Sequence, residues 1–180
     1  LETILTSPAS QLEILTGKFI VVSFFGMSSV IFGLTGMLAA VKLNSDIPDE
    51  IITVAMNILG IKPVLLILSL LFPIALFFAS FLLAISFYAK TFKEAQSIMG
   101  PLNIIVIMPI AIGMMPGITL DTSTAWIPIL NVSLAMNDII AGTLSILLYF
   151  EVMLSLLAFT ALSMWVSVKF VSRESVIFRG

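Results

Sequence analysis

The sequence predicts an all-α integral membrane protein, a bundle of four transmembrane helices with short interfacial helices. Hydrophobic residues make up 60% of the chain, charged residues only 10%, and the mean hydropathy is +1.22. Soluble domains have about a quarter of their residues charged. Four stretches are also long enough to cross roughly 30 Å of hydrocarbon. The few charges form no basic patch, so we expect the partner to be the lipid bilayer and not nucleic acid.

The chain opens with the polar stretch LETILTSPASQLEILTGKF. Residues 1–18 are predicted to form a helix that Pro8 stops, followed by a second helix with capping-box residues Ser10 and Glu13 at its start. Such a segment lies along the membrane surface and then enters it. Because the chain starts at Leu1 and no signal peptide is visible, we expect this to be the C-terminal part of a longer polypeptide.

Four apolar stretches follow, and each is predicted to span the membrane. The third contains Pro101, Pro109 and Pro116, which remove backbone donors; it is therefore expected to be bent and covered by protein. The bend is either a hinge that opens the bundle or a static kink. The predicted spans are 19–41, 63–89, 98–118 and 144–168.

Lysine and arginine positions predict the orientation, since basic residues near span ends are retained in the cytoplasm. Both ends of this chain are then cytoplasmic, including a loop at 90–97 and a tail at 169–180. The outer loops are 42–62, with a short helix, and 119–143. The cytoplasmic set is Lys18, Lys90, Lys93, Lys169, Arg173 and Arg179, against Lys42 and Lys62 outside.

The loop at 119–143 is predicted to contain an amphipathic or re-entrant helix over 127–141, too short to span the bilayer. Its polar residues Asn131, Asn137 and Asp138 are expected to point away from the apolar face. That apolar face comprises Val132, Ala135, Met136, Ile139 and Ile140.

Small residues recur at four-residue spacing in three of the spans. Such pairs let helix backbones approach closely within lipid. They favour a compact bundle that also dimerises. The pairs are Ser29 with Gly33, Gly36 with Ala40, Ala75 with Ala79, Ser80 with Ala84, and Gly113 with Gly117.

Glu151 is the one ionisable carboxyl deep within a span, where a charge is costly. Two roles remain open. Glu151 lies on a cation path, or it supports the outer helix through Asn131 or Asn137. Asn103, near the inner end of the third span, is the other candidate for the transport path, with a hydrogen bond to a neighbouring helix as its alternative role.

The residue inventory argues against catalysis in this chain. It has no cysteine and no histidine, which excludes thiol nucleophiles and imidazole acid–base chemistry and leaves no expected metal site or cofactor. A phosphate loop is also missing, because the only Gly-Lys pair, Gly17-Lys18, is followed by Phe19, and Leu12 takes the position of the first glycine. Any ATP must therefore be hydrolysed elsewhere.

The opening stretch resembles the segment before a transmembrane helix in type-2 ABC exporter permeases. The matching positions include Leu1, Glu2, Ile4, Leu5, Ser7 and Pro8, then Leu15, Gly17 and Lys18 at the helix entrance. Three further stretches resemble the sodium-extrusion (NatB-like) branch of that family. They are AKTFKEAQSIMGPL at 89–102, WIPILNVSLAMNDIIAG at 126–142 and SRESVIFR at 172–179.

The resemblance implies a six-span permease in the plasma membrane of a bacterium, of which this chain supplies the third to sixth spans. Two permease copies, or a permease and a close partner, would form the pore, and separate ATPase subunits carrying Mg-ATP would power export. Leu1, Glu2, Ile4, Leu5, Pro8 and Lys18 would couple to the ATPase, and the helix with Asn131, Asn137 and Asp138 would cap the exit. Two alternatives stay open: an ion-coupled carrier or channel using Glu151, and a non-transporting membrane anchor.

Overall fold

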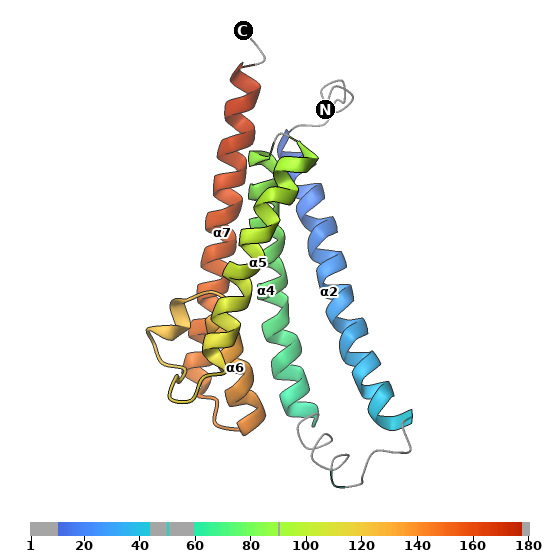
Figure 1. Ribbon diagram of the computed structural model, residues 1–180, viewed down its shortest axis with the longest axis vertical. Helices are drawn as coiled ribbons and strands as arrows, with labels where there is room; N and C mark the ends of the chain where they lie inside the picture. The colour runs from blue at the N-terminus through green and yellow to red at the C-terminus, as the bar shows by residue number, and fades with distance from the viewer. Residues whose placement is uncertain (1–10, 44–49, 51–59, 90, 178–180) are drawn as a thin grey trace.

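The computed structural model describes residues 11–43, 50, 60–89 and 91–177, and over these residues the chain is helical with no β-strand (Figure 1). The predicted all-α fold class is therefore confirmed. Four helices are long and apolar enough to cross a membrane. The elements are α2 (Gln11–Leu43), α4 (Ile61–Tyr88), α5 (Phe92–Gly113), the 3-10 helix η1 (Thr124–Trp126), α6 (Leu130–Ala141) and α7 (Ile146–Ile177).

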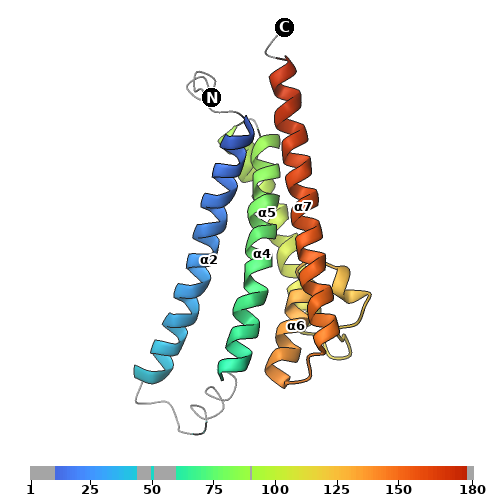
Figure 2. The same cartoon turned by 180° about the vertical axis from the view of Figure 1, so that it is seen from behind.

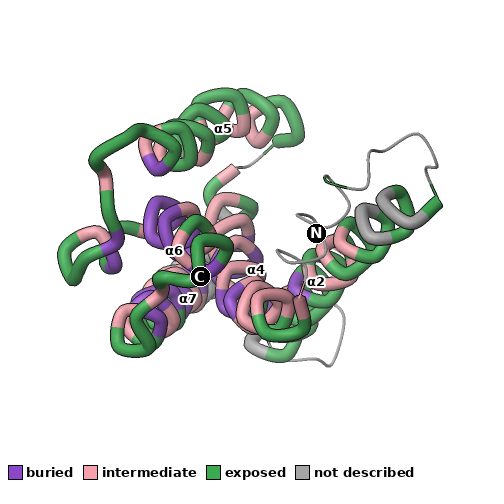
Figure 3. Tube along the Cα trace, turned by 90° about the horizontal axis from the view of Figure 1, so that it is seen from below, coloured by how far each residue is buried: buried purple, intermediate pink, exposed green. Residues whose placement is uncertain are grey.

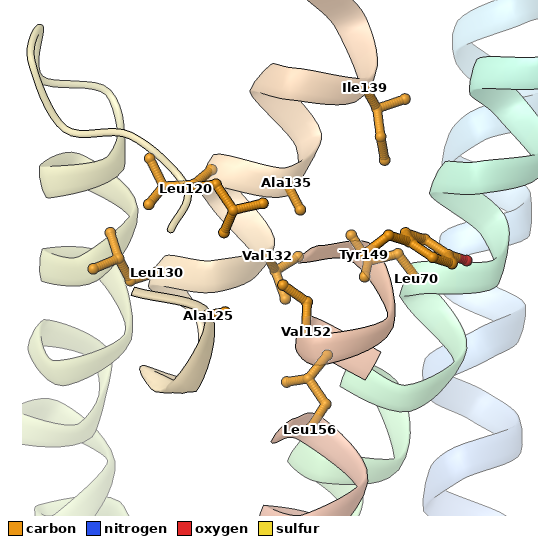
Figure 4. Packing of buried hydrophobic residues seen from close by; sticks show 11 residues of the cluster. Leu70, Leu120, Ala125, Leu130, Val132, Ala135, Ile139, Tyr149, Val152 and Leu156 are labelled. Carbon is orange, nitrogen blue, oxygen red and sulfur yellow. The ribbon is translucent and has the colours of Figure 1, made fainter. Parts of the chain in front are cut away.

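Helices α4 and α7 form the centre of the bundle and run side by side in the same direction (Figures 1 and 2). Phe77 on α4 and Phe159 on α7 pack edge to face, with ring centroids 6.4 Å apart. The short elements η1 and α6 pack against one end of this pair, and the core is concentrated there (Figure 4). Its buried residues are Leu70, Leu120, Ala125, Leu130, Val132, Leu134, Ala135, Ile139, Tyr149, Val152 and Leu156.

The two ends of the bundle differ in charge. Helix α2 begins and α7 ends at the same end of the molecule (Figure 2). Lys18, Lys93 and Lys169 are exposed near that end. Among the side chains that the structure describes there, they outnumber the acids Glu13 and Glu94, so we call it the basic end. The opposite end contains α6 and is called the α6 end. Lys62 lies there, in the first turn of α4.

The third long helix is displaced from the predicted span. It begins at Phe92 because the Thr91 side chain caps it, accepting a hydrogen bond of 3.2 Å from the Glu94 amide. Most of the loop expected at 90–97 is therefore helical. The helix ends at Gly113, and Met115, the residue that precedes Pro116, lies in a bend outside it. Pro116 consequently lies in a turn beyond α5 and kinks no helix.

Helix α5 stands apart from the other long helices (Figure 3). It packs mainly on α6, and Gly113 is its only buried residue. Within the described residues, the other helices of this chain therefore leave most of this proline-containing helix uncovered. Pro101 and Pro109 lie inside α5 on a largely open surface.

Helix α2 contacts α4 near the basic end and leans away from it toward the α6 end (Figures 1 and 2). The two helices still touch midway along α2, where a methyl group added at Gly26 would lie 3.9 Å from the Ala75 methyl. Beyond it, Gly33 and Gly36 face open space, so neither forms a helix contact inside the described chain. The small residues of α4 behave differently, because Ala79 and Ser80 are both buried.

Candidate functional site

The structure distributes the predicted site residues over three regions. Leu1, Glu2, Ile4, Leu5 and Pro8 lie outside the described residues. Lys18 is exposed on α2 at the basic end, and Asn103 is exposed on α5 with no hydrogen bond to other described residues. The remaining candidates lie on α6 and α7, and they are Asn131, Asn137, Asp138 and Glu151.

Asn131 is fully buried and joins three elements. Its Nδ2 donates hydrogen bonds to the Ala125 carbonyl of η1 at 2.9 Å and to Ser155 Oγ of α7 at 3.4 Å. Its Oδ1 accepts from the Val132 amide at 2.7 Å. The prediction that Asn131 points away from the apolar face is therefore wrong. The side chain can be buried because its amide satisfies the Ala125 carbonyl of η1 and the Ser155 hydroxyl of α7.

Asn137 is exposed as predicted, and it fixes the other side of α6. Its Nδ2 donates to the Gly113 carbonyl at 3.0 Å, which satisfies one of the last carbonyls of α5. Asp138 stabilises the end of α6, which is at Ala141. Its carbonyl accepts a hydrogen bond from the Thr143 amide at 2.9 Å, and its carboxylate accepts one from the Thr143 hydroxyl at 3.2 Å. Gly142 follows with a φ of 72°, a conformation that glycine adopts without strain.

The apolar face of α6 is mostly as predicted. Val132, Ala135 and Ile139 are buried in the core, and Met136 packs against it. Ile140 is an exception, because it is exposed. Leu130 and Leu134 belong to the buried face as well, which extends that face around the helix to include Asn131.

Glu151 lies on α7, about 7.5 Å along the helix axis from its first residue. It shares a face with Ser155 one turn further on, so it stands beside the contact between Asn131 and α7. The side chain is partly buried. Its Oε2 atom is buried and has no hydrogen-bond partner. Asn131 and Asn137 bind other groups, so the structure does not show the expected hydrogen bond from either amide to Glu151.

A second polar contact joins the central helices near this site. The hydroxyl groups of Ser69 on α4 and Tyr149 on α7 form a short hydrogen bond. Ser69 lies four residues before Pro73, and proline provides no amide for the Ser69 carbonyl. Sequence reasoning missed Ser69, Tyr149 and Ser155, because a hydroxyl in an apolar span carries no signal of its own without the neighbouring helix.

Glu151 is the carboxylate that the α6 end offers to a ligand. A partly buried carboxyl group inside a span can bind a proton or a monovalent cation. Within the described residues there is no group of three or more acidic, histidine or cysteine side chains that could hold a metal ion.

The basic end has an open, mainly apolar pocket of about 650 Å³ between α2, α4 and α5. Gly17 and Lys18 line it from α2, and Met99 lines it from the start of α5. The pocket thus brings together two stretches that lie some eighty residues apart in the sequence. Its other lining residues are Ile14, Val21, Val22, Leu82, Leu83 and Ser86.

The fold and the helix compositions define the class as an all-α, multi-pass membrane protein. Comparison of the chain with protein-family models, with curated proteins and with solved structures finds no match.

Proposed function

We propose that the chain is part of the permease subunit of an ABC exporter. It moves a substrate out of the cell, with sodium ions as the first candidate, and a separate ATPase subunit hydrolyses Mg-ATP to drive the movement. The permease itself is not an enzyme. It converts movement of the ATPase on one side of the membrane into opening on the other, because each state of the bundle makes different contacts.

The observation that carries the proposal is the pocket at the basic end. Gly17 and Lys18 belong to the opening motif that resembles exporter permeases, and Met99 belongs to the second such stretch, at 89–102. Their meeting at one end supports a shared surface on which an ATPase can act. A displacement of the starts of α2 and α5 would then be transmitted to α4, since all three helices line the pocket.

Orientation and assembly follow as parts of the same proposal. The basic end faces the cytoplasm of a bacterial cell, as the distribution of Lys18, Lys93 and Lys169 favours. A second permease copy covers α5, whose exposed Asn103 would otherwise place an amide in lipid at a cost. The α6 end then faces outward, with α6 over the exit.

Flux into inside-out membrane vesicles tests this function. Vesicles from cells that produce the intact protein and its neighbouring gene products are expected to accumulate ²²Na⁺ when ATP is added, and vesicles lacking the chain are not. Uptake that follows a proton gradient without ATP would instead support the carrier. Absence of any ATP-driven ion uptake, together with normal membrane insertion, would support the anchor.

One observation favours the second candidate function, an ion-coupled carrier or channel. Glu151 Oε2 is buried without a partner, as expected of a carboxylate that exchanges a bound cation or proton. Glu151→Gln keeps the size of the side chain and removes its charge. If Glu151 carries the cation, this variant loses sodium flux, whereas the control change Glu50→Gln, at an exposed carboxylate outside the four long helices, retains it. Normal flux in Glu151→Gln assigns the residue a structural role.

A further inference from the structure

Helices α2 and α4 run in opposite directions and touch near Gly26 and Ala75. From this contact they diverge toward the α6 end (Figures 1 and 2). Beyond this contact each helix carries a stripe of residues, and the side chains of the two stripes are complementary in size.

The face on α2 consists of small residues. They recur at alternating three- and four-residue spacing, which keeps them within one stripe of the helix. Beyond Gly26 the stripe is exposed, and a methyl added at Gly33 or Gly36 would have no atom within 4 Å. The stripe comprises Gly26, Ser29, Gly33, Gly36 and Ala40.

The face on α4 consists of large apolar residues with the same spacing in reverse order. Phe72 is 46% exposed, Leu65 is 59% exposed and Ile61 is 82% exposed, although the opposite side of α4 is packed in the core. The stripe begins at Ala75, where α2 already makes contact, and continues through Phe72, Leu68, Leu65 and Ile61.

The Gly26–Ala75 contact fixes how these stripes would align. In an antiparallel helix pair, each step forward on one helix is matched by a step backward on the other. Ser29 then faces Phe72, Gly33 faces Leu68, Gly36 faces Leu65 and Ala40 faces Ile61. At all four positions a small residue meets a large one, the arrangement in which side chains of one helix fill gaps on its neighbour.

We propose that the outer half of α2 closes onto α4 along this seam, so that the arrangement in the structure is the open one. Within lipid, helix association depends on close van der Waals packing, and glycine faces permit it. Two side chains also ease bending of α2, because Ser28 Oγ and Thr35 Oγ1 donate to backbone carbonyls one turn earlier, at 2.8 Å and 2.9 Å. The closure is inferred from helix packing alone and does not rest on the identity of the substrate.

Disulfide trapping tests the closure directly, since the chain contains no cysteine of its own. Gly33→Cys with Leu68→Cys is the seam pair. Gly26→Cys with Ala75→Cys is the positive control, because 3.9 Å between the β-carbons lies within the range of about 3.5–4.5 Å for disulfides. Gly33→Cys with Ile67→Cys is the negative control, since Ile67 packs against the core.

Each pair is oxidised in native membranes of the intact protein, with a protease site inserted between the two helices. Within one chain, a disulfide keeps the two halves together after cleavage. We expect bonds in the control at Gly26 and in the seam pair, and none with Ile67. A bond in the Gly26 pair without one in the Gly33 pair overturns the closure. Bonds that form only between two copies of the chain also overturn it, because a second copy would then pack against the α2 stripe in place of α4. A missing bond at Gly26 also overturns it, because the alignment rests on that contact.

Discussion

Asn131 is the residue whose polarity matters most for the fold at the α6 end. A buried amide that bonds η1 and α7 together cannot be removed without leaving the Ala125 carbonyl and Ser155 unsatisfied. Burial without a partner costs about 1–3 kcal/mol per group. The same side chain in a lipid-facing position would have no comparable effect.

Asn131→Ala is therefore expected to lower the free energy of unfolding by about 1–3 kcal/mol. Thermal unfolding in detergent measures this as a lower midpoint. Asn137→Ala is the control and should lower the midpoint less, because Asn137 is exposed and its amide makes one hydrogen bond, to the Gly113 carbonyl, whereas buried Asn131 bonds to three groups. Equal midpoints for Asn131→Ala and the unaltered protein would contradict the role given to the buried amide.

Asp121 organises the turn that leads into η1. Its Oδ1 accepts from the Ser123 hydroxyl at 2.6 Å and from the amides of Ser123 and Thr124 at 2.8 Å each. These bonds, the Ser123 hydroxyl foremost, lower the pKa of Asp121 from its usual 3.8. A carboxyl with a lowered pKa stabilises the fold above its unfolded pKa and loses that contribution as the pH falls through the folded value.

We therefore expect the turn to persist from neutral pH down to about 3.8 and to loosen only below it. Trp126, in η1, reports this by fluorescence once the other tryptophan is removed by Trp165→Phe. In Asp121→Asn the emission should already be altered at pH 7. An emission change centred at about pH 5 or higher would show that another group controls the turn.

At the scale of elements, α6 is held between α5 and α7. Asn137 and Gly113 fasten it to α5, and Asn131 and Ser155 fasten it to α7. Gly113 is essential to the first contact, because a methyl there would lie 2.6 Å from Ser133 Oγ and 3.0 Å from its β-carbon. The two helices approach too closely for any side chain at this position.

Gly113→Ala is accordingly expected to destabilise the protein by about 1–3 kcal/mol through overpacking. The double variant with Ser133→Ala should recover part of this loss, since it removes the nearer atom. Gly100→Ala, in the same helix but with nothing within 4 Å, should leave the melting midpoint unchanged or raise it slightly. Equal effects of the two glycine substitutions would contradict the close contact.

The sequence predicted the presence of the elements better than their limits. Four long apolar stretches can only be helices that satisfy their own backbone in lipid, and all four occur. The third span is predicted to start at residue 98, because Lys93 and Glu94 suggest a loop, but α5 starts at Phe92. Thr91 and Glu94 have the spacing of a helix cap. Charges next to a cap often belong to the first turn of a helix.

Side-chain placement was less predictable, for a physical reason. Helical spacing gave the buried face of α6 at Val132, Ala135 and Ile139, but polarity alone placed Asn131 outside it. A buried amide is favourable when partners surround it, and those partners, Ala125 and Ser155, come from other elements. Glu151 was found from the sequence, whereas its lack of a hydrogen-bond partner depends on the packing of α7.

At the scale of the whole molecule, the bundle has a packed α6 end and a basic end where α2, α4 and α5 share a pocket. Under the proposed function, the basic end receives the ATPase and the α6 end controls release. The chain has no phosphate loop of its own, so the proposed export depends on an ATPase that binds it.

Purification of the intact protein from its native membrane, followed by an assay of ATP hydrolysis, tests this dependence most directly. We predict that a phosphate-loop ATPase co-purifies in a defined ratio and that vanadate inhibits the hydrolysis. Reversing the charge of Lys18 by Lys18→Glu should weaken that association without preventing membrane insertion. Homogeneous protein that contains no ATPase, shows no hydrolysis and still supports ion flux in vesicles would contradict the proposed exporter.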